Sequence, residues 1–339
     1  MDTKHFRGSR RFGVVAGATG AAAALTLGLA AAPAGAAPTG SASVADDTLT
    51  VSGTSRSERI ALRLAPGDPA TLQVDFGDDG SAEHSFDRTT FSSIVVVARS
   101  GDDSFRVDQG NGAFADEVLS VDGGSGNDTL DGGDGSETFR GGSGKDAVDG
   151  NRGDDTGVLG SGNDSFRWDP GDGSDVVEGR SGTDTLDFNG AGVNETMRLS
   201  PENGRSVFLR DVANIRMDMD DVERLDLTAL GGADTMTVDD MKGTDFRTAN
   251  VDLSGPTGVG DGQADTVTVN GSERRDHIDV TAYGSQVQAR GLRTTVNVAG
   301  SELTDLLQVN ALGGDDDVDV DPAVLARIGV AVDLGSGQY

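Results

Sequence analysis

Carboxylate side chains recur every nine residues in a glycine-rich stretch of this chain, which begins "GGSGNDTLDGGDGSETFRGGSGKDAVDG" at residue 123. Seven nine-residue units align across residues 123–187, with two extra residues, Trp168 and Asp169, after the fifth unit. The sixth position is acidic in every unit: Asp128, Glu137, Asp146, Asp155, Asp164, Asp175 and Asp184. Stacked carboxylates repel one another unless a cation neutralises them, so this spacing predicts a series of cation-binding turns.

Glycine occupies the fourth position of every unit and is common at the second position as well. Glycine adopts the positive-φ conformations that a tight turn needs, and it lets main-chain carbonyl groups gather around an ion. We therefore expect the glycine turns to contribute to the metal sites together with the carboxylates. The candidate site glycines are Gly124, Gly126, Gly133, Gly135, Gly142, Gly144, Gly160, Gly162, Gly173 and Gly182.

The donor set favours calcium over other metals. A hard divalent cation takes six or more oxygen ligands, and Ca²⁺ accepts many flexible ligands where Mg²⁺ demands a stricter geometry. Zinc is not expected, because the chain has no cysteine and only three scattered histidines. The sequence therefore predicts Ca²⁺ as the cofactor.

The eighth position of the units indicates which secondary structure holds these carboxylates. This position is apolar in six of the seven units and is Gly157 in the other. This pattern predicts a short strand in each unit, with one side chain pointing inward. Two units then complete one turn of a flattened parallel solenoid, so residues eighteen apart stack on the same edge. The expected order is Asp128, Asp146, Asp164 and Asp184 on one edge, and Glu137, Asp155 and Asp175 on the other.

The unit resembles G-G-x-G-x-D-x-U-x, the nonapeptide of RTX or haemolysin-type calcium-binding repeats, and "GGSGNDTLD" carries every position. The stretches 168–195, 210–240 and 260–271 are further similar to actinobacterial secreted calcium-binding proteins. These resemblances imply a calcium-binding β-solenoid outside the cell and bring no reaction with them. The units depart from the pattern at Glu137, Lys145, Arg152 and Gly157, so we expect fewer ions than a perfect array would hold.

The whole chain is expected to be all-β, a parallel β-roll or β-solenoid with stacked Gly/Asp turns. Residues 37–122 and 188–339 are interpreted as less regular solenoid coils on either side of the block 123–187. Related turns occur at 98–107, 228–238 and 310–320. Their carboxylates could bind further ions or only solvate the edges of the sheets, where charge discourages aggregation.

Residues 1–36 have the features of a signal peptide: basic residues, an apolar stretch and the small-residue site Ala34-Gly35-Ala36. The sequence "SRRFGVV" resembles a twin-arginine signal and leaves the export route open. No later segment is apolar enough to span a membrane, so we expect a secreted protein without membrane insertion after signal removal. The net charge of −30 argues against nucleic acid as a partner.

The predicted function is that of a secreted calcium-binding repeat protein with a structural or adhesive role, whose partner is an extracellular surface or a polysaccharide. The chain has no H-E-x-x-H and no G-x-S-x-G motif, and we do not expect an enzyme. Trp168 is expected to pack in the solenoid and not to stack on a sugar. Two alternatives stay open, a solenoid enzyme acting on extracellular polysaccharide and an RTX-like effector.

Overall fold

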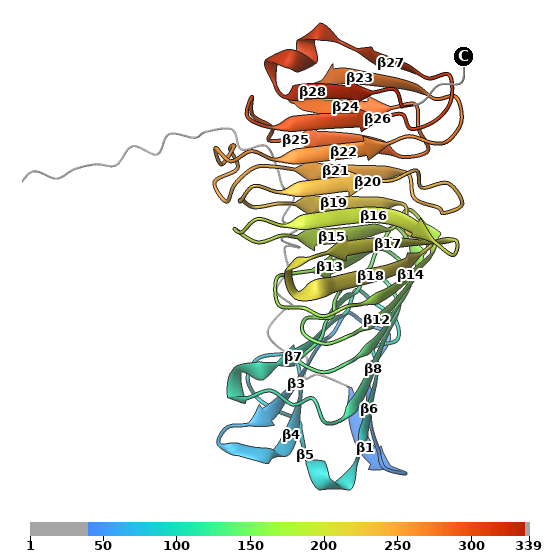
Figure 1. Ribbon diagram of the computed structural model, residues 1–339. Coiled ribbons are helices and arrows are strands. Elements are labelled where there is room, and N and C mark those ends of the chain that lie inside the picture. Colours follow the sequence, from blue (N-terminus) through green and yellow to red (C-terminus); the bar gives the residue numbers. More distant parts are fainter. Residues whose placement is uncertain (1–39, 336–339) are drawn as a thin grey trace, which may run out of the picture. The chain divides into compact units, whose positions relative to one another are not determined.

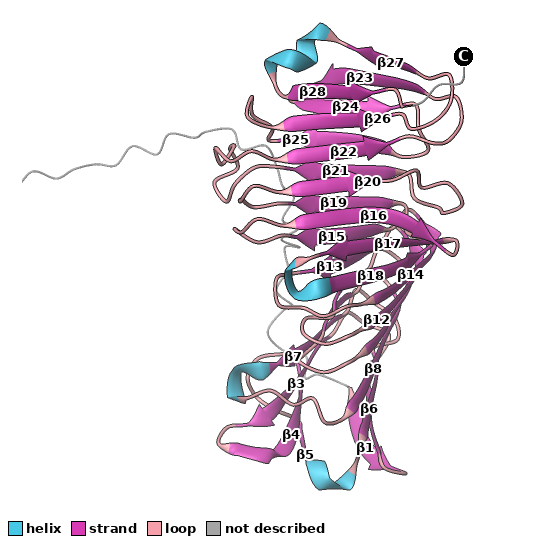
Figure 2. Cartoon of the chain, viewed as in Figure 1, coloured by secondary structure: helices cyan, strands magenta, loops and turns pink. Residues whose placement is uncertain are grey.

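The computed structural model describes residues 40–335, and the predicted signal peptide lies outside these residues. The described chain forms 28 β-strands and four short 3₁₀ helices (Figures 1 and 2). The 3₁₀ helices are η1 (Arg88–Thr90), η2 (Gln109–Asn111), η3 (Val212–Asn214) and η4 (Pro322–Ala326). No helix in this part of the chain has the length and apolar character needed to cross a membrane. The fold is all-β, as the sequence predicts.

The strands form two 14-stranded sheets, here called sheet A and sheet B. Sheet A contains, in spatial order, β1 (Ser41–Ala45), β2 (Thr48–Ser52), β6 (Ser93–Val97), β8 (Val118–Ser125), β10 (Thr138–Ser143), β12 (Thr156–Gly162), β14 (Val176–Gly182), β18 (Ile215–Asp220), β17 (Arg205–Arg210), β16 (Thr196–Glu202), β20 (Thr235–Val238), β22 (Thr266–Asn270), β26 (Leu306–Asn310) and β28 (Gly329–Asp333). Sheet B contains β5 (His84–Asp87), β4 (Asp68–Phe76), β3 (Arg59–Ala65), β7 (Ser104–Asp108), β9 (Thr129–Asp131), β11 (Ala147–Asp149), β13 (Ser165–Trp168), β15 (Thr185–Asn189), β19 (Arg224–Thr228), β21 (Thr248–Asp252), β25 (Thr295–Ala299), β24 (Gln286–Arg290), β23 (His277–Tyr283) and β27 (Asp317–Val320).

Within the block 123–187 successive strands alternate between the two sheets, and each strand pairs in parallel with the strand two positions later in the chain. Phe139 lies opposite Val121 and Gly157 in sheet A, and Val148 lies opposite Leu130 in sheet B. These partners are eighteen residues apart, so two nine-residue units complete one coil. The inward side chains of both sheets belong to one hydrophobic core.

The core position at Gly157 is not empty, although a missing side chain leads one to expect a gap there. A Cβ atom on Gly157 would lie 2.8 Å from a ring carbon of Phe166. The buried Phe166 ring therefore fills the space from the opposite sheet. This departure from the repeat is accommodated by core packing, because close-packed interiors do not leave such a volume unfilled.

The flanking coils are irregular because antiparallel strands are inserted into the parallel sheets. In sheet A, β16, β17 and β18 form an antiparallel meander, while β18 pairs in parallel with β14 and β16 with β20. In sheet B, β23, β24 and β25 form a second meander between β27 and β21. The hairpin between β16 and β17 turns at Asn203 and Gly204, both with positive φ, which is the signature of a type I′ turn.

Trp168 and Asp169, the two extra residues that interrupt the nine-residue repeat, are accommodated by aromatic packing in the core. The Trp168 ring is fully buried and stacks on Phe188 with 4.1 Å between ring centroids. Its indole N–H donates to the carbonyl oxygen of Gly173 at 2.8 Å, which satisfies the one polar atom of the side chain. The expectation that Trp168 packs within the solenoid is confirmed.

Candidate metal centre

Four acidic residues of the block, Asp128, Asp146, Asp164 and Asp184, stack along one edge of sheet B in the order expected from the sequence. The main-chain N–H of Asp128 donates to Oδ1 of Asp146 at 2.8 Å. The N–H of Asp146 donates in the same way to Asp164, and that of Asp164 to Asp184, both at 2.8 Å. Each carboxylate therefore holds the backbone of the preceding coil in place. We call this series the first ladder.

The first ladder continues beyond the nine-residue units at both ends. The N–H of Asp103 donates to Oδ1 of Asp128 at 2.8 Å, and the N–H of Glu58 donates to Oδ1 of Asp103 at 2.7 Å. At the other end, the N–H of Asp184 donates to Oε2 of Glu223 at 2.7 Å. The turn 98–107, which contains Asp103, is one of the possible further ion sites in the sequence, whereas Glu58 and Glu223 were not predicted because their spacing in the chain is irregular.

A shorter series, the second ladder, runs along the edge of sheet A. The N–H of Glu137 donates to Oδ1 of Asp155 at 2.7 Å, and the N–H of Asp155 donates to Oδ1 of Asp175 at 2.8 Å. These three residues are brought together as predicted. The second ladder ends where the β16–β18 meander enters sheet A.

Glycine turns allow the coils to stack closely enough for these hydrogen bonds. Gly126 and Gly144 both have φ near +135°. A Cβ atom on Gly144 would lie 1.8 Å from the carbonyl oxygen of Gly126, so only glycine fits there. The predicted glycines with positive φ are Gly124, Gly126, Gly142, Gly144, Gly160, Gly162 and Gly182.

Three predicted glycines differ from this pattern. Gly133, Gly135 and Gly173 do not have φ in the left-handed range. Gly173 is nevertheless required by close approach, because a Cβ atom there would lie 1.7 Å from the carbonyl oxygen of Gly153. The N–H groups of Gly133 and Gly135 donate instead to the side chain of Glu137, described below.

The second carboxylate oxygen of most rungs is buried without a hydrogen-bond donor. Asp128, Asp146 and Asp164 are each only 1% exposed. Their Oδ1 atoms accept the main-chain bonds above, whereas their Oδ2 atoms have no partner among the described residues. The same holds for Oδ2 of Asp103, Asp155 and Asp184. A buried carboxylate oxygen without a donor is energetically costly unless a cation or another donor compensates it.

The first glycine of a unit makes room for this oxygen, a role that the sequence analysis missed. A Cβ atom on Gly123 would lie 2.5 Å from Oδ2 of Asp128, five residues later. The corresponding distance is 2.6 Å for Gly141 and Asp146. The sequence could have predicted this role, because glycine is the first residue of the units that begin at residues 123, 132, 141, 150 and 179.

Burial and mutual repulsion raise the pKa values of the rungs. Burial is the main cause, and neighbouring carboxylates add to it, so that the pKa of Asp146 and of Asp184 rises to about 7. The pKa of Asp155 rises to about 8 for the same reasons, next to Glu137 and Asp175. The main-chain N–H bonds oppose these shifts only in part. The ionised ladder therefore carries negative charge that the protein itself does not neutralise.

Glu137 is the exception among the rungs. Its two carboxylate oxygens accept hydrogen bonds from the N–H groups of Gly133 and Gly135, both at 3.2 Å. The extra methylene lets the side chain reach back to its own turn, so no oxygen is left without a donor. This geometry gives a physical reason to expect a weaker metal site at Glu137 than at an aspartate rung.

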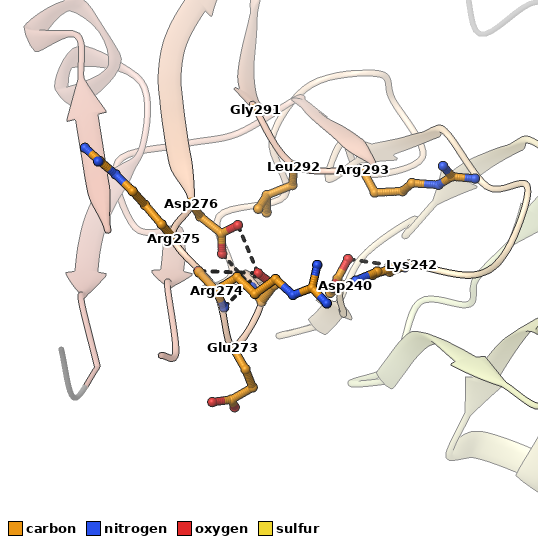
Figure 3. A pocket seen from close by; sticks show the side chains of 10 residues that line it. Asp240, Lys242, Glu273, Arg274, Arg275, Asp276, Gly291, Leu292 and Arg293 are labelled. Atoms are coloured by element: carbon orange, nitrogen blue, oxygen red, sulfur yellow. Dashed lines mark hydrogen bonds between the residues drawn. The ribbon is translucent and has the colours of Figure 1, made fainter. Parts of the chain in front are cut away.

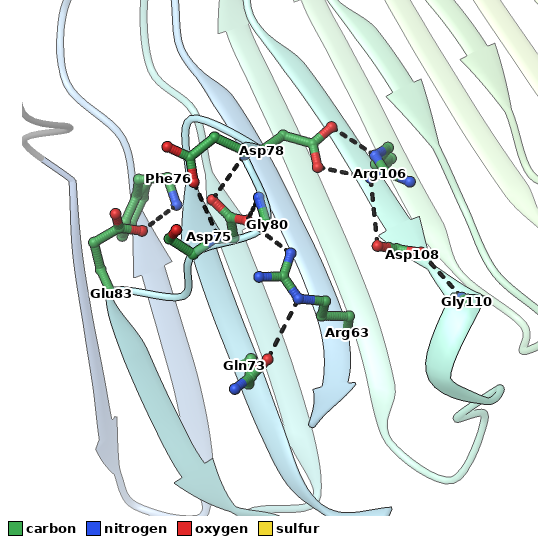
Figure 4. A network of polar contacts seen from close by, with 12 residues as sticks. Arg63, Gln73, Asp75, Phe76, Asp78, Gly80, Glu83, Arg106, Asp108 and Gly110 are labelled. Atoms are coloured by element: carbon green, nitrogen blue, oxygen red, sulfur yellow. Dashed lines mark hydrogen bonds and ion pairs between the residues drawn. The ribbon is translucent and has the colours of Figure 1, made fainter. Parts of the chain in front are cut away.

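A buried acid near the N-terminal end shows how the protein neutralises a carboxylate without an ion. Oδ2 of Asp75 accepts from Arg63 at 2.7 Å and from the N–H of Gly80 at 2.9 Å (Figure 4). Both side chains are almost fully buried. The ladders have no such basic partner at their unpartnered Oδ2 atoms, and hard oxygen donors of this kind fit Ca²⁺.

Two further groupings involve the turn at 310–320, which the sequence singles out, and partners on another strand that were not predicted. His277 Nδ1 lies 3.2 Å from Oδ2 of Asp317 on the neighbouring strand, in an exposed position. Asp276 forms a rung with Asp316, whose Oδ1 accepts the Asp276 N–H at 2.8 Å. The Asp276 carboxylate borders an open depression and is bonded to Ser272 (Figure 3), so both of its oxygens have donors within the protein.

A known repeat family matches the part of the chain that contains the nine-residue units of the first and second ladders. A family model described as the RTX calcium-binding nonapeptide repeat matches residues 120–148, 131–166 and 171–190. A search of solved structures found the crystal structure of extracellular lipase LipA from Serratia marcescens, with 15% sequence identity and a TM-score of 0.15. That match covers 59% of this chain and 43% of the lipase chain. No curated protein matches the chain. The stacked turns of residues 120–190 are therefore RTX calcium-binding nonapeptide repeats, set in a β-solenoid.

Proposed function

We propose that the chain is a secreted structural or adhesive protein whose solenoid is completed and stabilised by calcium bound along the two ladders. The observation that carries this proposal is the row of buried Oδ2 atoms without donors at Asp103, Asp128, Asp146, Asp164 and Asp184. These oxygens would hold the ions together with the glycine turns. Bound calcium would supply the positive charge that the protein lacks there.

The coupling between calcium and stability follows from mass action. A ligand that binds only the folded state stabilises it by about 2.7 kcal/mol at a concentration one hundred times its dissociation constant. Several stacked sites add such contributions, and the stacked turns do not exist as sites in the unfolded chain. An extracellular medium supplies calcium continuously, which supports the proposal that the protein works after export.

We propose that the chain acts through binding and not through catalysis. The support is the arrangement of the buried carboxylates, each of which accepts an N–H group of the preceding coil in a repeated structural pattern. A hydrolase for polysaccharide would instead set two carboxylates apart across a substrate site. Incubation of the calcium-loaded protein with extracellular polysaccharides, followed by a reducing-sugar assay, tests this point, and turnover would contradict it.

The central experiment is a calcium titration of chelator-treated protein, followed by far-ultraviolet circular dichroism and by the heat of binding. We expect β-structure to increase with several ions bound per chain, and magnesium not to reproduce the effect. Asp146→Asn should lower the number of bound ions, because it removes a rung oxygen from the first ladder. Asp131→Asn is the matched control, since Asp131 has the same charge but follows the inward residue Leu130 and faces outward.

A fully folded calcium-free protein that releases no heat on calcium addition would overturn the proposal. The ladders would then be held by protonated carboxyl groups alone. Equal loss of calcium in Asp131→Asn and Asp146→Asn would likewise argue for diffuse attraction by surface charge instead of defined sites.

A further inference from the structure

A third series of stacked carboxylates lies on the edge of sheet A after the β16–β18 meander, outside the residues matched by the repeat family. The N–H of Glu195 donates to Oδ1 of Asp234 at 2.8 Å, and the N–H of Asp234 donates to Oδ1 of Asp265 at 2.8 Å. The N–H of Asp265 donates in turn to Oδ1 of Asp305 at 3.2 Å. We call these four residues the third ladder.

The sequence spacing of the third ladder is unlike that of a nonapeptide array. Its successive rungs are 39, 31 and 40 residues apart in the chain. The strands that follow the rungs nevertheless stack in register, with Thr235 opposite Thr196 and Thr266. The long loops and inserted strands leave the coil-to-coil geometry of this edge unchanged.

At the two ends of the third ladder, both carboxylate oxygens have partners within the protein. Glu195 forms a buried ion pair with Arg210, which reaches it from the β17 strand. The Oδ2 atom of Asp305 accepts the N–H of Glu302 at 2.6 Å. The end rungs therefore need no bound cation.

The middle of the third ladder lacks such compensation. Asp234 is 3% exposed, and its Oδ2 atom is buried without a donor among the described residues. The charged groups that act on it are all acidic, namely Glu195, Asp265 and Asp261. The half-buried Asp261 lies at the same turn, where its Oδ2 accepts the N–H of Gly232 at 2.9 Å. Asp261 and Asp265 thus accept two N–H groups of the turn Gly232–Asp234, and Asp234 itself has a buried oxygen without a partner.

The backbone at this turn matches that of the nonapeptide turns. Gly232, two residues before Asp234, has φ of +115°, and a Cβ atom there would lie 2.5 Å from the main chain of Val193. Gly126 stands in the same relation to Asp128 in the first ladder. The turn thus combines a tight main-chain approach with an unpartnered carboxylate oxygen.

We propose that Asp234, together with Asp265 and Asp261, forms a calcium site that is independent of the nonapeptide repeats. The ligand class is a hard divalent cation, because every side-chain donor at the site is a carboxylate oxygen. The site lies between the coil that contains β20 and the coil that contains β22. It would tie together two coils joined by a long loop, which have no short-range repeat to align them.

Equilibrium dialysis with calcium tests this site by counting the ions bound per chain. We expect Asp234→Asn and Asp265→Asn each to bind one ion fewer than the wild-type protein. The matched control is Asp245→Asn, because Asp245 has a carboxylate that is 52% exposed in a neighbouring loop and should leave the count unchanged. A folded Asp234→Asn protein with the wild-type number of ions would overturn the inference.

A second measurement on the unaltered protein keeps the test decisive if the variants fail to fold. Crystals grown with terbium in place of calcium should give an anomalous-scattering peak beside Asp234, in addition to peaks in the block 123–187. Peaks in the block with none beside Asp234 would overturn this inference and leave the proposed function intact. The absence of peaks at both places would overturn both.

Discussion

At the scale of single residues, an aspartate in these ladders has two separate roles, one for each carboxylate oxygen. Oδ1 holds the N–H of the preceding coil, and Oδ2 lies buried against a glycine five residues earlier, as in Asp128 and Gly123. Glu137 keeps neither role in this form, because both of its oxygens turn back to the amides of the Gly133–Gly135 turn. The longer side chain thus accounts for the different bonding of Glu137 at the sixth position.

The raised pKa values predict an unusual pH dependence for the calcium-free protein. Burial and neighbouring carboxylates raise the pKa from 3.8 to about 7 in Asp146 and Asp184 and to about 8 in Asp155. The folded state then binds more protons than the unfolded chain between about pH 4 and pH 8, so its stability falls as the pH rises through this range. We expect a higher melting temperature in chelator at pH 5 than at pH 8.

Calcium should reverse this dependence, because it binds the ionised carboxylates. The rise in melting temperature on adding calcium is therefore expected to be larger at pH 8 than at pH 5. Asp146→Asn removes one titrating rung and should flatten the profile measured in chelator. A chelated protein that becomes more stable from pH 5 to pH 8 would contradict the assigned protonation states.

The order of the rungs in the block could be predicted from sequence because period, glycine and acid all repeat at nine residues. Glu58, Glu195 and Asp265 escaped prediction, since no fixed period links them to the block. They share a shorter signal, an acidic residue two positions before the first inward apolar residue, as in Glu58 before Ile60 and Asp265 before Val267. Only stacking in space shows which of the many acidic residues with this signal become rungs.

At the scale of elements, the meanders explain why the flanking regions have no regular repeat. The stretch Asn203-Gly204 is a strong type I′ hairpin signal that the sequence analysis did not use. Tertiary pairing decides where such a hairpin enters the parallel sheet. Here β18 pairs with β14, and β16 pairs with β20. Local sequence predicts the turn but not the partner strands.

The β17 strand carries Arg210, and its replacement should be costly. The guanidinium pairs with Glu195, and both side chains are almost fully buried, so Arg210→Met would leave a buried carboxylate without its cation. Removing one partner of a buried ion pair costs about 3–5 kcal/mol. We expect the free energy of unfolding to fall by about this amount in urea denaturation.

The control for this prediction is Arg198→Met on the neighbouring strand β16. Arg198 pairs with Asp239, but its side chain is 57% exposed, and such pairs contribute about 0–1 kcal/mol. An equal loss of stability in the two variants would mean that burial does not distinguish the pairs. A near-neutral Arg210→Met would mean that Glu195 is protonated or compensated by another group.

At the scale of the whole molecule, most of the unpartnered buried carboxylate oxygens lie in or next to the block, and the flanks have fewer of them, at Asp234 and Asp316. Five successive rungs of the first ladder, from Asp103 to Asp184, have an Oδ2 atom without a donor. The flanks contain the buried pairs Arg63–Asp75 and Arg210–Glu195 instead. Each coil of a solenoid contacts mainly its neighbours, so parts of the stack can lose structure without the rest.

Chelation should therefore loosen the chain unevenly. We expect hydrogen exchange in chelator to be fast for β8–β15, where repulsion is strongest, and to stay slow for the β3–β4 hairpin and the β23–β25 meander. Those hairpins have antiparallel pairing and, at Arg63 and Asp75, an internal ion pair. As the calcium concentration rises, we expect hydrogen exchange in β8–β15 to become slow again. Uniform loss of protection over the described chain would instead mean that calcium holds the solenoid as one cooperative unit, with no flank able to persist beside an unfolded block.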